Sequence, residues 1–206
     1  MNDSTALSPG RGRRPVTTRR AVELVSLDLF TAIGFDRTTI DDIATAAGIG
    51  RRTFFRYFAS KSDIVWAGFD DEVQRLRDKL AVRPDDEPVA AAVRAGILDA
   101  SHFDASDLPE LRRRLWLIAT VPALQAHAAL RYREWEQVIA EFAGRRWNRP
   151  PESLAPRAFA AAVRGAASVA YERWVERGNA SLNSYLDATL TELTRGFADS
   201  TTIPDL

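Results

Sequence analysis

Residues 38–61 constrain the fold of this chain more than any other stretch of its 206 residues. Thr39 and Asp42 have the spacing of a capping box, in which a hydroxyl three residues before a carboxylate marks the start of a helix. One apolar helical face follows, made of Ile40, Ile43, Ala44 and Ala47. Gly48 stands where that helix must end, because glycine takes up the left-handed backbone conformation at low cost. The stretch therefore predicts a helix, a tight turn and a second helix, which is the arrangement of a helix-turn-helix.

The second helix of this motif divides into an inner and an outer side. Phe54 and Phe58 lie four residues apart and are expected to face inward. The other sides carry Arg51, Arg52, Thr53 and Arg56. Arginine pairs in bidentate fashion with guanine, and the methyl group of threonine contacts the methyl group of thymine. These four residues are the expected base readers of a DNA-recognition helix.

The segment from about Thr18 to Lys61 resembles the DNA-binding domain of the TetR family of bacterial transcription regulators. The matching residues are Leu29-Phe30, Gly34-Phe35, Thr38-Thr39-Ile40, Ile43-Ala44, Ala47-Gly48-Ile49, Thr53-Phe54-Phe55-Arg56-Tyr57-Phe58 and Ser60-Lys61. The resemblance implies that Thr39, Tyr57 and Lys61 contact phosphate groups. Phe55 departs from the pattern, because many relatives carry a tyrosine there. The complete set of expected DNA contacts is Thr39, Gly50, Arg51, Arg52, Thr53, Phe55, Arg56, Tyr57 and Lys61.

The chain also resembles one branch of this family, the regulators encoded beside mycofactocin biosynthesis genes. The matching residues are the run from Gly48 to Phe58, Lys61, Trp66, the run from Pro122 to His127, Trp135 and Ala140-Glu141-Phe142. This resemblance implies a hydrophobic effector of the acyl type, such as an acyl-CoA.

The zero net charge of the chain hides an asymmetry between its two parts. Residues 1–61 contain 10 Lys and Arg against 6 Asp and Glu, whereas residues 62–206 contain 18 against 22. The basic part holds the helix-turn-helix, as attraction to phosphate requires. Residues 1–16 read as a flexible basic arm with Arg11, Arg13 and Arg14. This arm is expected either to reach DNA or to act as a disordered, solubilising tail.

The expected location of the protein is the cytoplasm. The sequence contains no cysteine, which fits a reducing compartment. Its polar N-terminus lacks the apolar core of a secretory signal. No apolar run has the length that a membrane-spanning helix needs.

The sequence lacks the alternation typical of strands, so the predicted fold is all-α with about nine helices. Residues 17–61 are expected to form the helix-turn-helix DNA-binding domain. Residues 62–206 are expected to form a helical ligand-binding and dimerisation domain.

The helices behind the motif follow from apolar spacing and from proline positions. One helix is expected to run from Ser60 to about Val82, because apolar residues recur there at every third or fourth position. Prolines precede or open the later helices, where the first helical turn tolerates them. These helices are expected at residues 88–102, 108–120, 122–147, 156–177 and 182–197.

The last two predicted helices carry the residues expected to join two copies of the chain. Phe159, Ala162, Val163, Ala166, Ala170 and Trp174 follow one helical face, and Leu182, Leu186, Leu190, Leu193 and Phe197 follow the other. Two such helices from each copy would form a four-helix bundle. The TetR resemblance places the homodimer there as well. The alternative is that these faces only complete the core of one copy.

Aromatic residues are abundant behind the helix-turn-helix, and the expected ligand contacts are Trp66, Phe69, Phe103, Trp116, Tyr132, Trp135 and Tyr171. Aromatic walls with few polar groups are typical of small-molecule pockets, although plain core packing is the alternative for each residue. The run from Arg112 to Arg114 is interpreted as a solvated charge run, with contact to an anionic ligand as the alternative. His102 and His127 are too isolated to suggest a metal site.

Together these features predict a homodimeric repressor that binds a palindromic operator and is released by a hydrophobic small molecule. The alternative is a constitutive, architectural DNA-binding protein without an effector. Catalysis would need converging acid–base or nucleophilic groups, and the sequence suggests none. We therefore expect no enzyme activity, no cofactor and no metal ion.

Overall fold

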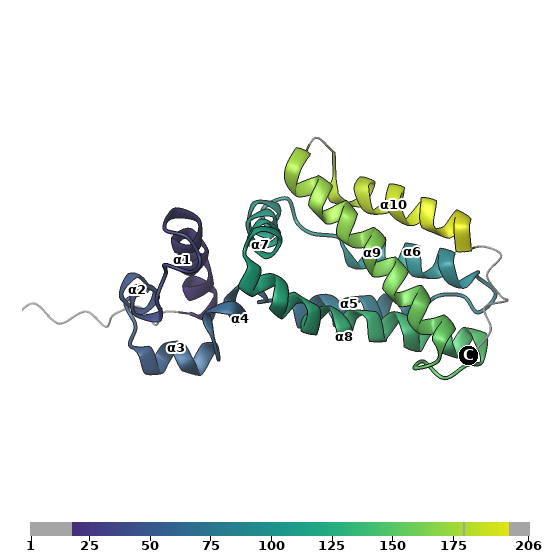
Figure 1. Cartoon of the computed structure of the whole chain (residues 1–206), viewed down its shortest axis with the longest axis horizontal. Coiled ribbons are helices and arrows are strands. Elements are labelled where there is room, and N and C mark those ends of the chain that lie inside the picture. Colours follow the sequence, from purple (N-terminus) through teal and green to yellow (C-terminus); the bar gives the residue numbers. More distant parts are fainter. Residues whose placement is uncertain (1–17, 179, 198–206) are drawn as a thin grey trace, which may run out of the picture.

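The computed structural model describes residues 18–178 and 180–197, and these residues form ten helices and no strand (Figure 1). The helices are α1 (Arg19–Ala32), α2 (Ile40–Ala46), α3 (Arg51–Tyr57), α4 (Lys61–Val65), α5 (Phe69–Ala81), α6 (Val89–Ala100), α7 (Leu108–Thr120), α8 (Pro122–Trp147), α9 (Leu154–Arg177) and α10 (Leu182–Phe197). The predicted all-α fold is confirmed. The predicted basic arm of residues 1–16 lies outside the described residues, as does the side chain of Phe197. No helix among the described residues is both long and apolar enough to cross a membrane.

The turn of the predicted helix-turn-helix has the expected capping. The Thr39 hydroxyl accepts a hydrogen bond from the Asp42 backbone N–H at 3.1 Å, and the Thr39 N–H donates to the Asp42 carboxylate at 2.8 Å. Gly48 has a φ of +65°, the left-handed conformation that ends α2. A second capping box joins Ser60 and Asp63 at the start of α4. These caps were readable from the sequence because each is a contact between near neighbours.

The core of the N-terminal domain draws on more than the helix-turn-helix. Its buried residues from α1 to α3 include Val22, Leu27, Phe30, Ile43, Phe54 and Phe58, and those from later segments include Ile64, Val65, Trp66, Leu117 and Leu124. A core built from three short helices alone would bury little apolar surface. The N-terminal core therefore uses residues on both sides of the boundary predicted between residues 61 and 62.

The prediction of one continuous helix from Ser60 to Val82 was wrong. α4 ends at Val65, Gly68 takes a φ of +85°, and α5 begins at Phe69. The break turns the Trp66 ring inward, where it lies 5.3 Å from the Phe69 ring and 5.5 Å from the Tyr132 ring between centroids. Trp66 is buried as a result. This break raises the number of helices from the expected nine to ten within the described residues.

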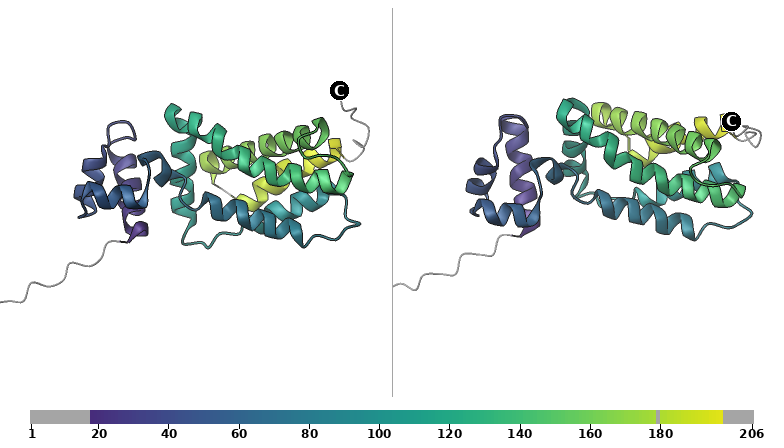
Figure 2. Two further views of the ribbon diagram at one scale, coloured as in Figure 1. Left: turned by 90° about the horizontal axis from the view of Figure 1, so that it is seen from below. Right: turned by 60° about the horizontal axis from the view of Figure 1, so that its bottom comes forward.

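The C-terminal helices form a bundle in which α9 packs against α8 and α10, and α5 packs against α6. Figure 1 shows α7 between the N-terminal domain and this bundle, and both views in Figure 2 agree. The leucine face of α10 is turned into the monomer, where Leu182, Leu186 and Leu190 are at most 3% exposed. Phe159, Val163 and Trp174 of α9 lie in the same core. Most residues of the two faces expected to join two copies therefore complete the core of one copy.

Replacing Gly68 tests whether its backbone holds α4 and α5 apart. A Cβ at this position would meet no atom within 4 Å. The cost of a substitution therefore comes from the left-handed backbone conformation and not from a steric clash. An L-residue in the left-handed region costs about 1–2 kcal/mol. We expect Gly68→Ala to lower the free energy of unfolding by about that amount in urea denaturation. Gly68→Asn is the matched control. It should lower the free energy of unfolding less than Gly68→Ala does, because asparagine tolerates the left-handed conformation better than alanine. Equal stability of the three proteins would contradict this account.

Candidate DNA interface and ligand cavities

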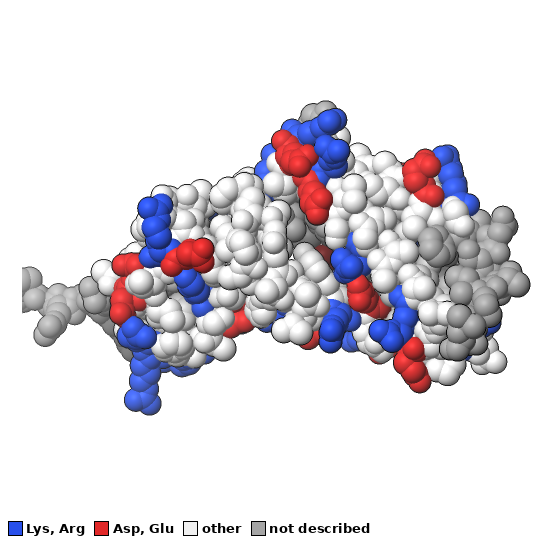
Figure 3. Space-filling view, in the orientation of Figure 1, with Lys and Arg blue, Asp and Glu red and all other residues white. Residues whose placement is uncertain are grey.

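The outer surface of α3 carries the arginines predicted to read DNA bases. Arg51, Arg52 and Arg56 are exposed and Thr53 is half-buried. The Arg51 guanidinium lies 2.8 Å from the Asp41 carboxylate, and both side chains are more than half exposed. An exposed ion pair of this kind contributes little to the stability of the fold. Arg51 can therefore replace Asp41 with another anion at low cost. Figure 3 shows Lys and Arg side chains projecting from the outer surface of the N-terminal domain.

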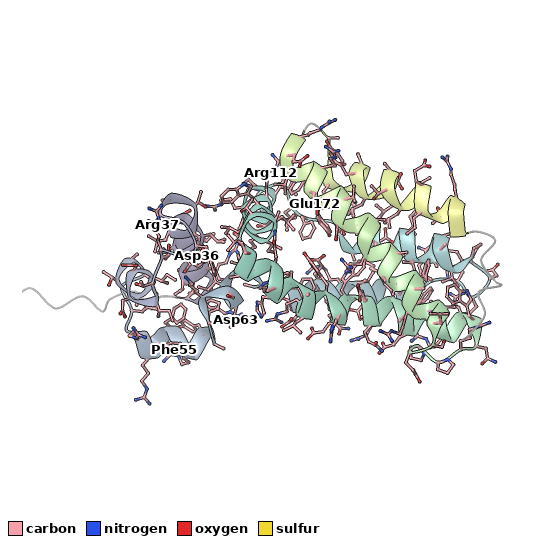
Figure 4. The ribbon with its side chains drawn as sticks, in the orientation of Figure 1. Asp36, Arg37, Phe55, Asp63, Arg112 and Glu172 are labelled. Carbon is pink, nitrogen blue, oxygen red and sulfur yellow. The ribbon has the colours of Figure 1, made fainter. Side chains whose placement is uncertain are left out.

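Phe55, the residue that departs from the family pattern, lies on α3 with 48% of its surface exposed (Figure 4). Its ring packs edge-on against Phe54 at 5.4 Å between centroids. The Arg51 guanidinium lies 5.9 Å from the Phe55 ring centroid. Phe55 therefore presents an apolar surface beside an arginine, which suits contact with a sugar or a thymine methyl group.

The three predicted phosphate contacts differ in how they are placed. Tyr57 is half-buried, and the Arg56 guanidinium lies 5.1 Å from its ring centroid. Thr39 is exposed, but its hydroxyl also bonds the Asp42 carboxylate at 2.7 Å. The hydroxyl and N–H of Thr39 lower the pKa of Asp42 through these hydrogen bonds. Thr39 therefore has a capping role in the free protein.

Lys61 holds the loop between α1 and α2 in this structure. Its ammonium group donates to the backbone carbonyls of Phe35 at 2.7 Å, Thr38 at 3.1 Å and Asp36 at 3.4 Å. It also lies 4.4 Å from the Phe35 ring centroid. These bonds match the three donors of an ammonium group, so a phosphate contact would have to replace or share one of them. The phosphate contact of Lys61 stays a prediction.

A buried ion network joins α7 to α1 and α4. The Arg114 side chain donates to the Glu110 carboxylate at 2.6 and 3.0 Å, to Glu23 of α1 at 3.4 Å, and to the carbonyl of Ile64 in α4. Arg20 of α1 lies 2.5 Å from the same Glu110 oxygen. Glu23, Glu110 and Arg114 are each less than 9% exposed. Burial acts to raise the pKa of Glu110, but the hydrogen bonds from Arg114 and Arg20 leave it lowered.

Our interpretation of the Arg112–Arg114 run as solvated was wrong for Arg114. The helical spacing of Glu110 and Arg114, four residues apart, signals a local ion pair but not its burial. Two further ion pairs support the same joint. Arg113 contacts the exposed Asp28 at 2.5 Å, and Arg131 lies 3.5 Å from the half-buried Asp63, which is labelled in Figure 4.

The C-terminal domain contains a cavity of about 530 Å³ beside the break between α4 and α5. Five of the seven predicted ligand contacts line it: Trp66, Phe69, Phe103, Tyr132 and Tyr171. Arg20, Glu110 and Arg114 of the ion network also line it. The wall of this cavity therefore includes the residues that join the two domains.

A second cavity of about 900 Å³ lies between α7, α8 and α9. Trp116, which is 44% exposed, lines this cavity. The two cavities share Leu115, Ile118, Tyr132 and Tyr171, so they adjoin along one wall. Trp135 lines neither cavity and lies in the C-terminal core, 8% exposed.

Sequence reasoning missed polar residues of the smaller cavity, among them Glu72. The Tyr171 hydroxyl donates to the Glu72 carboxylate at 3.3 Å. Burial raises the pKa of Glu72, although the charge of Arg75 and the bond from Tyr171 act against this. In the sequence, Glu72 is one of several acidic residues in the first turn of α5, which is a common position for solvated carboxylates. Nothing in that pattern indicates a cavity.

Both parts of the chain match known protein families. Residues 25–67 match the model of bacterial regulatory proteins of the tetR family, and residues 87–198 match the MftR C-terminal domain. A mycobacterial protein from Mycobacterium tuberculosis, named as the mycofactocin biosynthesis transcriptional regulator MftR, is 38% identical over 177 residues, which cover 86% of this chain and 89% of the relative. The HTH-type transcriptional regulator TcmR of Streptomyces glaucescens is 29% identical, over 95% of this chain and 92% of TcmR.

Solved structures share the fold at lower identity. The Thermus thermophilus repressor FadR, crystallised with lauroyl-CoA, aligns with a TM-score of 0.55 at 16% identity, over 92% of this chain and 97% of FadR. NalD, a repressor of a multidrug efflux pump in Pseudomonas aeruginosa, aligns with a TM-score of 0.59 at 20% identity, over 86% of this chain and 94% of NalD. The helix-turn-helix, the helical C-terminal domain and these matches together establish that the chain belongs to the TetR family of bacterial transcriptional regulators, with a C-terminal domain of the MftR type.

Proposed function

We propose that this regulator is a cytoplasmic repressor that binds a palindromic operator as a homodimer, has no enzyme activity, and is released by a hydrophobic effector. The observation that carries the proposal is the buried ion network, which joins the DNA-binding domain to the wall of an aromatic cavity. An architectural DNA-binding protein without an effector would not need a cavity of about 530 Å³ at this joint. The cavity therefore favours a regulator that senses a small molecule.

DNA recognition is assigned to α3 and its flanks. Arg51, Arg52 and Arg56 extend into solvent on α3, where a helix enters the major groove in helix-turn-helix proteins. Gly50 caps α3 without a side chain, which leaves space for close approach to DNA. Thr39, Tyr57 and Lys61 are assigned to phosphate groups and set the orientation of the domain.

The homodimer is assigned to the outward face of α9. Ala158, Ala161 and Val169 are exposed there, with the half-buried Gly165 between them. A Cβ at Gly165 would meet no atom within 4 Å, so this face of the monomer is open. Small side chains permit two helices to approach closely, and a symmetric operator calls for a two-fold symmetric protein. The interface thus uses the predicted helix but a different face of it.

The effector is assigned to the two adjoining cavities. Their aromatic and aliphatic lining suits a hydrophobic molecule, and the resemblance to mycofactocin-system regulators points to an acyl-type ligand such as an acyl-CoA. Bound lauroyl-CoA in the FadR structure shows that this fold can hold such a ligand. For the present chain, the shared wall between the cavities favours an elongated effector.

Coupling between effector and DNA is assigned to α7. This helix lines both cavities through Leu115 and Ile118, and it holds α1 and α4 through Glu110 and Arg114. An effector that displaces α7 would move the recognition helices away from the separation of about 34–36 Å that successive major grooves require. By thermodynamic linkage, DNA and effector then weaken each other's binding by the same factor.

Substitution of Arg52 tests the recognition helix. We expect Arg52→Ala to weaken operator binding by about 1–3 kcal/mol, because a bidentate contact with a base is lost. The melting temperature should not change, because Arg52 is exposed. Fluorescence anisotropy with operator DNA selected from a random pool provides the measurement. Arg77→Ala, which removes an exposed arginine from α5, is the control and should bind DNA as the parent does. Undiminished binding by Arg52→Ala would refute the assignment.

Substitution of Val169 tests the dimer face. Val169 is 49% exposed on α9, and an arginine there would bring two like charges together at a two-fold interface. We expect Val169→Arg to dissociate the dimer in sedimentation experiments and to weaken operator binding. Val82→Arg is the matched control, since Val82 is 78% exposed at the end of α5. If Val169→Arg remains a dimer, the interface lies elsewhere.

Substitution of Glu110 tests the joint between the domains. We expect Glu110→Gln to lower the free energy of unfolding by about 1–3 kcal/mol at neutral pH, because Arg114 and Arg20 lose a charged partner. The pKa of Glu110 is lowered in the folded state, so its contribution is present above the unfolded value of about 4.3 and is lost as the pH falls through the folded value. The difference between parent and variant in urea denaturation should therefore shrink in acid. A difference that is independent of pH would contradict the role of the charge.

A further inference from the structure

The wall shared by the two cavities contains polar groups in aromatic surroundings. Tyr132 of α8 and Tyr171 of α9 line both cavities, and Glu72 of α5 lines the smaller one. Trp66, Phe69 and Phe103 complete the aromatic lining on the side of the smaller cavity. The helices α5, α8 and α9 that carry these groups lie in the same bundle (Figure 1), where α8 packs against both α5 and α9.

The polar groups of this wall retain unused hydrogen-bonding capacity. Tyr171 donates to one oxygen of Glu72 at 3.3 Å. Within the described part of the chain, the second Glu72 oxygen has no hydrogen bond and no arginine or lysine lies within ion-pair distance of this carboxylate. The Tyr132 hydroxyl likewise has no partner among the described residues. A ligand that covers these cavity-facing groups is favoured when it also supplies them with hydrogen-bond partners, because a polar group that loses water without a partner costs free energy.

The protonation states of the two tyrosines make them donors at neutral pH. Burial, and next the charge of Glu72, raise the pKa of Tyr132 to about 12. The same two causes raise the pKa of Tyr171 well above its ordinary value. Tyr171 already donates to Glu72, so the donors that remain for a ligand include the Tyr132 hydroxyl and the Trp66 indole N–H, which is buried without a partner among the described residues.

The charges around the smaller cavity favour a neutral ligand group. Its lining contains four carboxylates and three guanidinium groups, and two of those guanidinium groups are bonded to Glu110. An anion would meet the negative charge of Glu72, which the third guanidinium group, Arg75, already offsets. A cation would meet the charge of Arg75, which already acts on Glu72. A neutral group that both donates and accepts a hydrogen bond avoids both problems.

We propose that the shared wall is a polar subsite for a neutral amide within an otherwise apolar effector, with Glu72 accepting from the amide N–H and the Tyr132 hydroxyl donating to the amide carbonyl. An amide presents its N–H and its carbonyl in opposite directions, so it needs partners on separate elements, here α5 and α8. Its apolar arms extend into the two cavities. The proposal rests on the effector function proposed for these cavities.

Three probes with the same chain length test the subsite on the full-length protein by titration calorimetry. N-methyldodecanamide carries the amide, methyl dodecanoate lacks the N–H donor, and dodecylamine carries a cation. We expect the parent to bind the amide about tenfold more tightly than the ester, because the ester leaves Glu72 without a partner. Dodecylamine should bind no more tightly than the ester.

Variants of the cavity wall test which residues cause the preference for the amide over the ester. Glu72→Leu should bring the affinities for amide and ester together, because only the amide carries the N–H that bonds Glu72. Tyr132→Phe should weaken the binding of amide and ester by a similar factor, because both carry the carbonyl that the Tyr132 hydroxyl bonds. Tyr132→Phe keeps the ring, so it serves even where Glu72→Leu folds poorly. Glu172→Gln is the matched control, because Glu172 lines the larger cavity only and lies on α9 (Figure 4). This control should keep the preference of the parent.

The outcomes separate this proposal from the proposed function. Equal binding of amide and ester by the parent overturns the amide subsite and leaves the effector function standing. Tightest binding of dodecylamine, lost in Glu72→Leu, overturns it in favour of a cation subsite. Failure of all three probes to bind overturns the subsite together with the hydrophobic effector function of the cavities.

Discussion

The buried ion network around Arg114 is the interaction on which the relation between the two domains depends. It brings together α1, α4 and α7, which come from distant parts of the chain. Removing one member of a buried network destabilises the folded protein, because it leaves the other charges without partners. Apolar packing tolerates small shifts of one helix against another. The directional hydrogen bonds of the network are satisfied only when α7 keeps its position relative to the DNA-binding domain. In the proposed mechanism, the network couples the position of α7 to that of the DNA-binding domain.

The smaller cavity lies where this network and the helix break meet. Trp66, Gly68 and Arg114 all line it, so an occupant would contact both the break and the joint. A continuous helix from Ser60 would keep its backbone polar groups bonded within the helix. The break instead frees the segment around Trp66 to form part of a cavity wall. In this way one glycine in a left-handed conformation shapes the proposed sensing site.

The exposed and the buried charges of the molecule have different roles. Arginines on α3 are solvated and weakly paired, which leaves them available to DNA. Arg114 is buried and bonded to three helices, so it is not available to any other partner in this conformation. Residue type alone does not separate these roles, and local sequence context shows both as arginines on amphipathic helices. Burial decides between them.

The sequence by itself determined the helix-turn-helix, the capping boxes and most helix boundaries. These features depend on residues within about four positions of each other, where helical geometry fixes which side chains meet. Only the tertiary structure decided the break at Gly68, the inward direction of the α10 leucines, the core position of Trp135 and the buried roles of Glu72 and Arg114. Each of these depends on contacts between helices far apart in the chain, and apolar spacing shows that a helix has a buried face without showing what covers it.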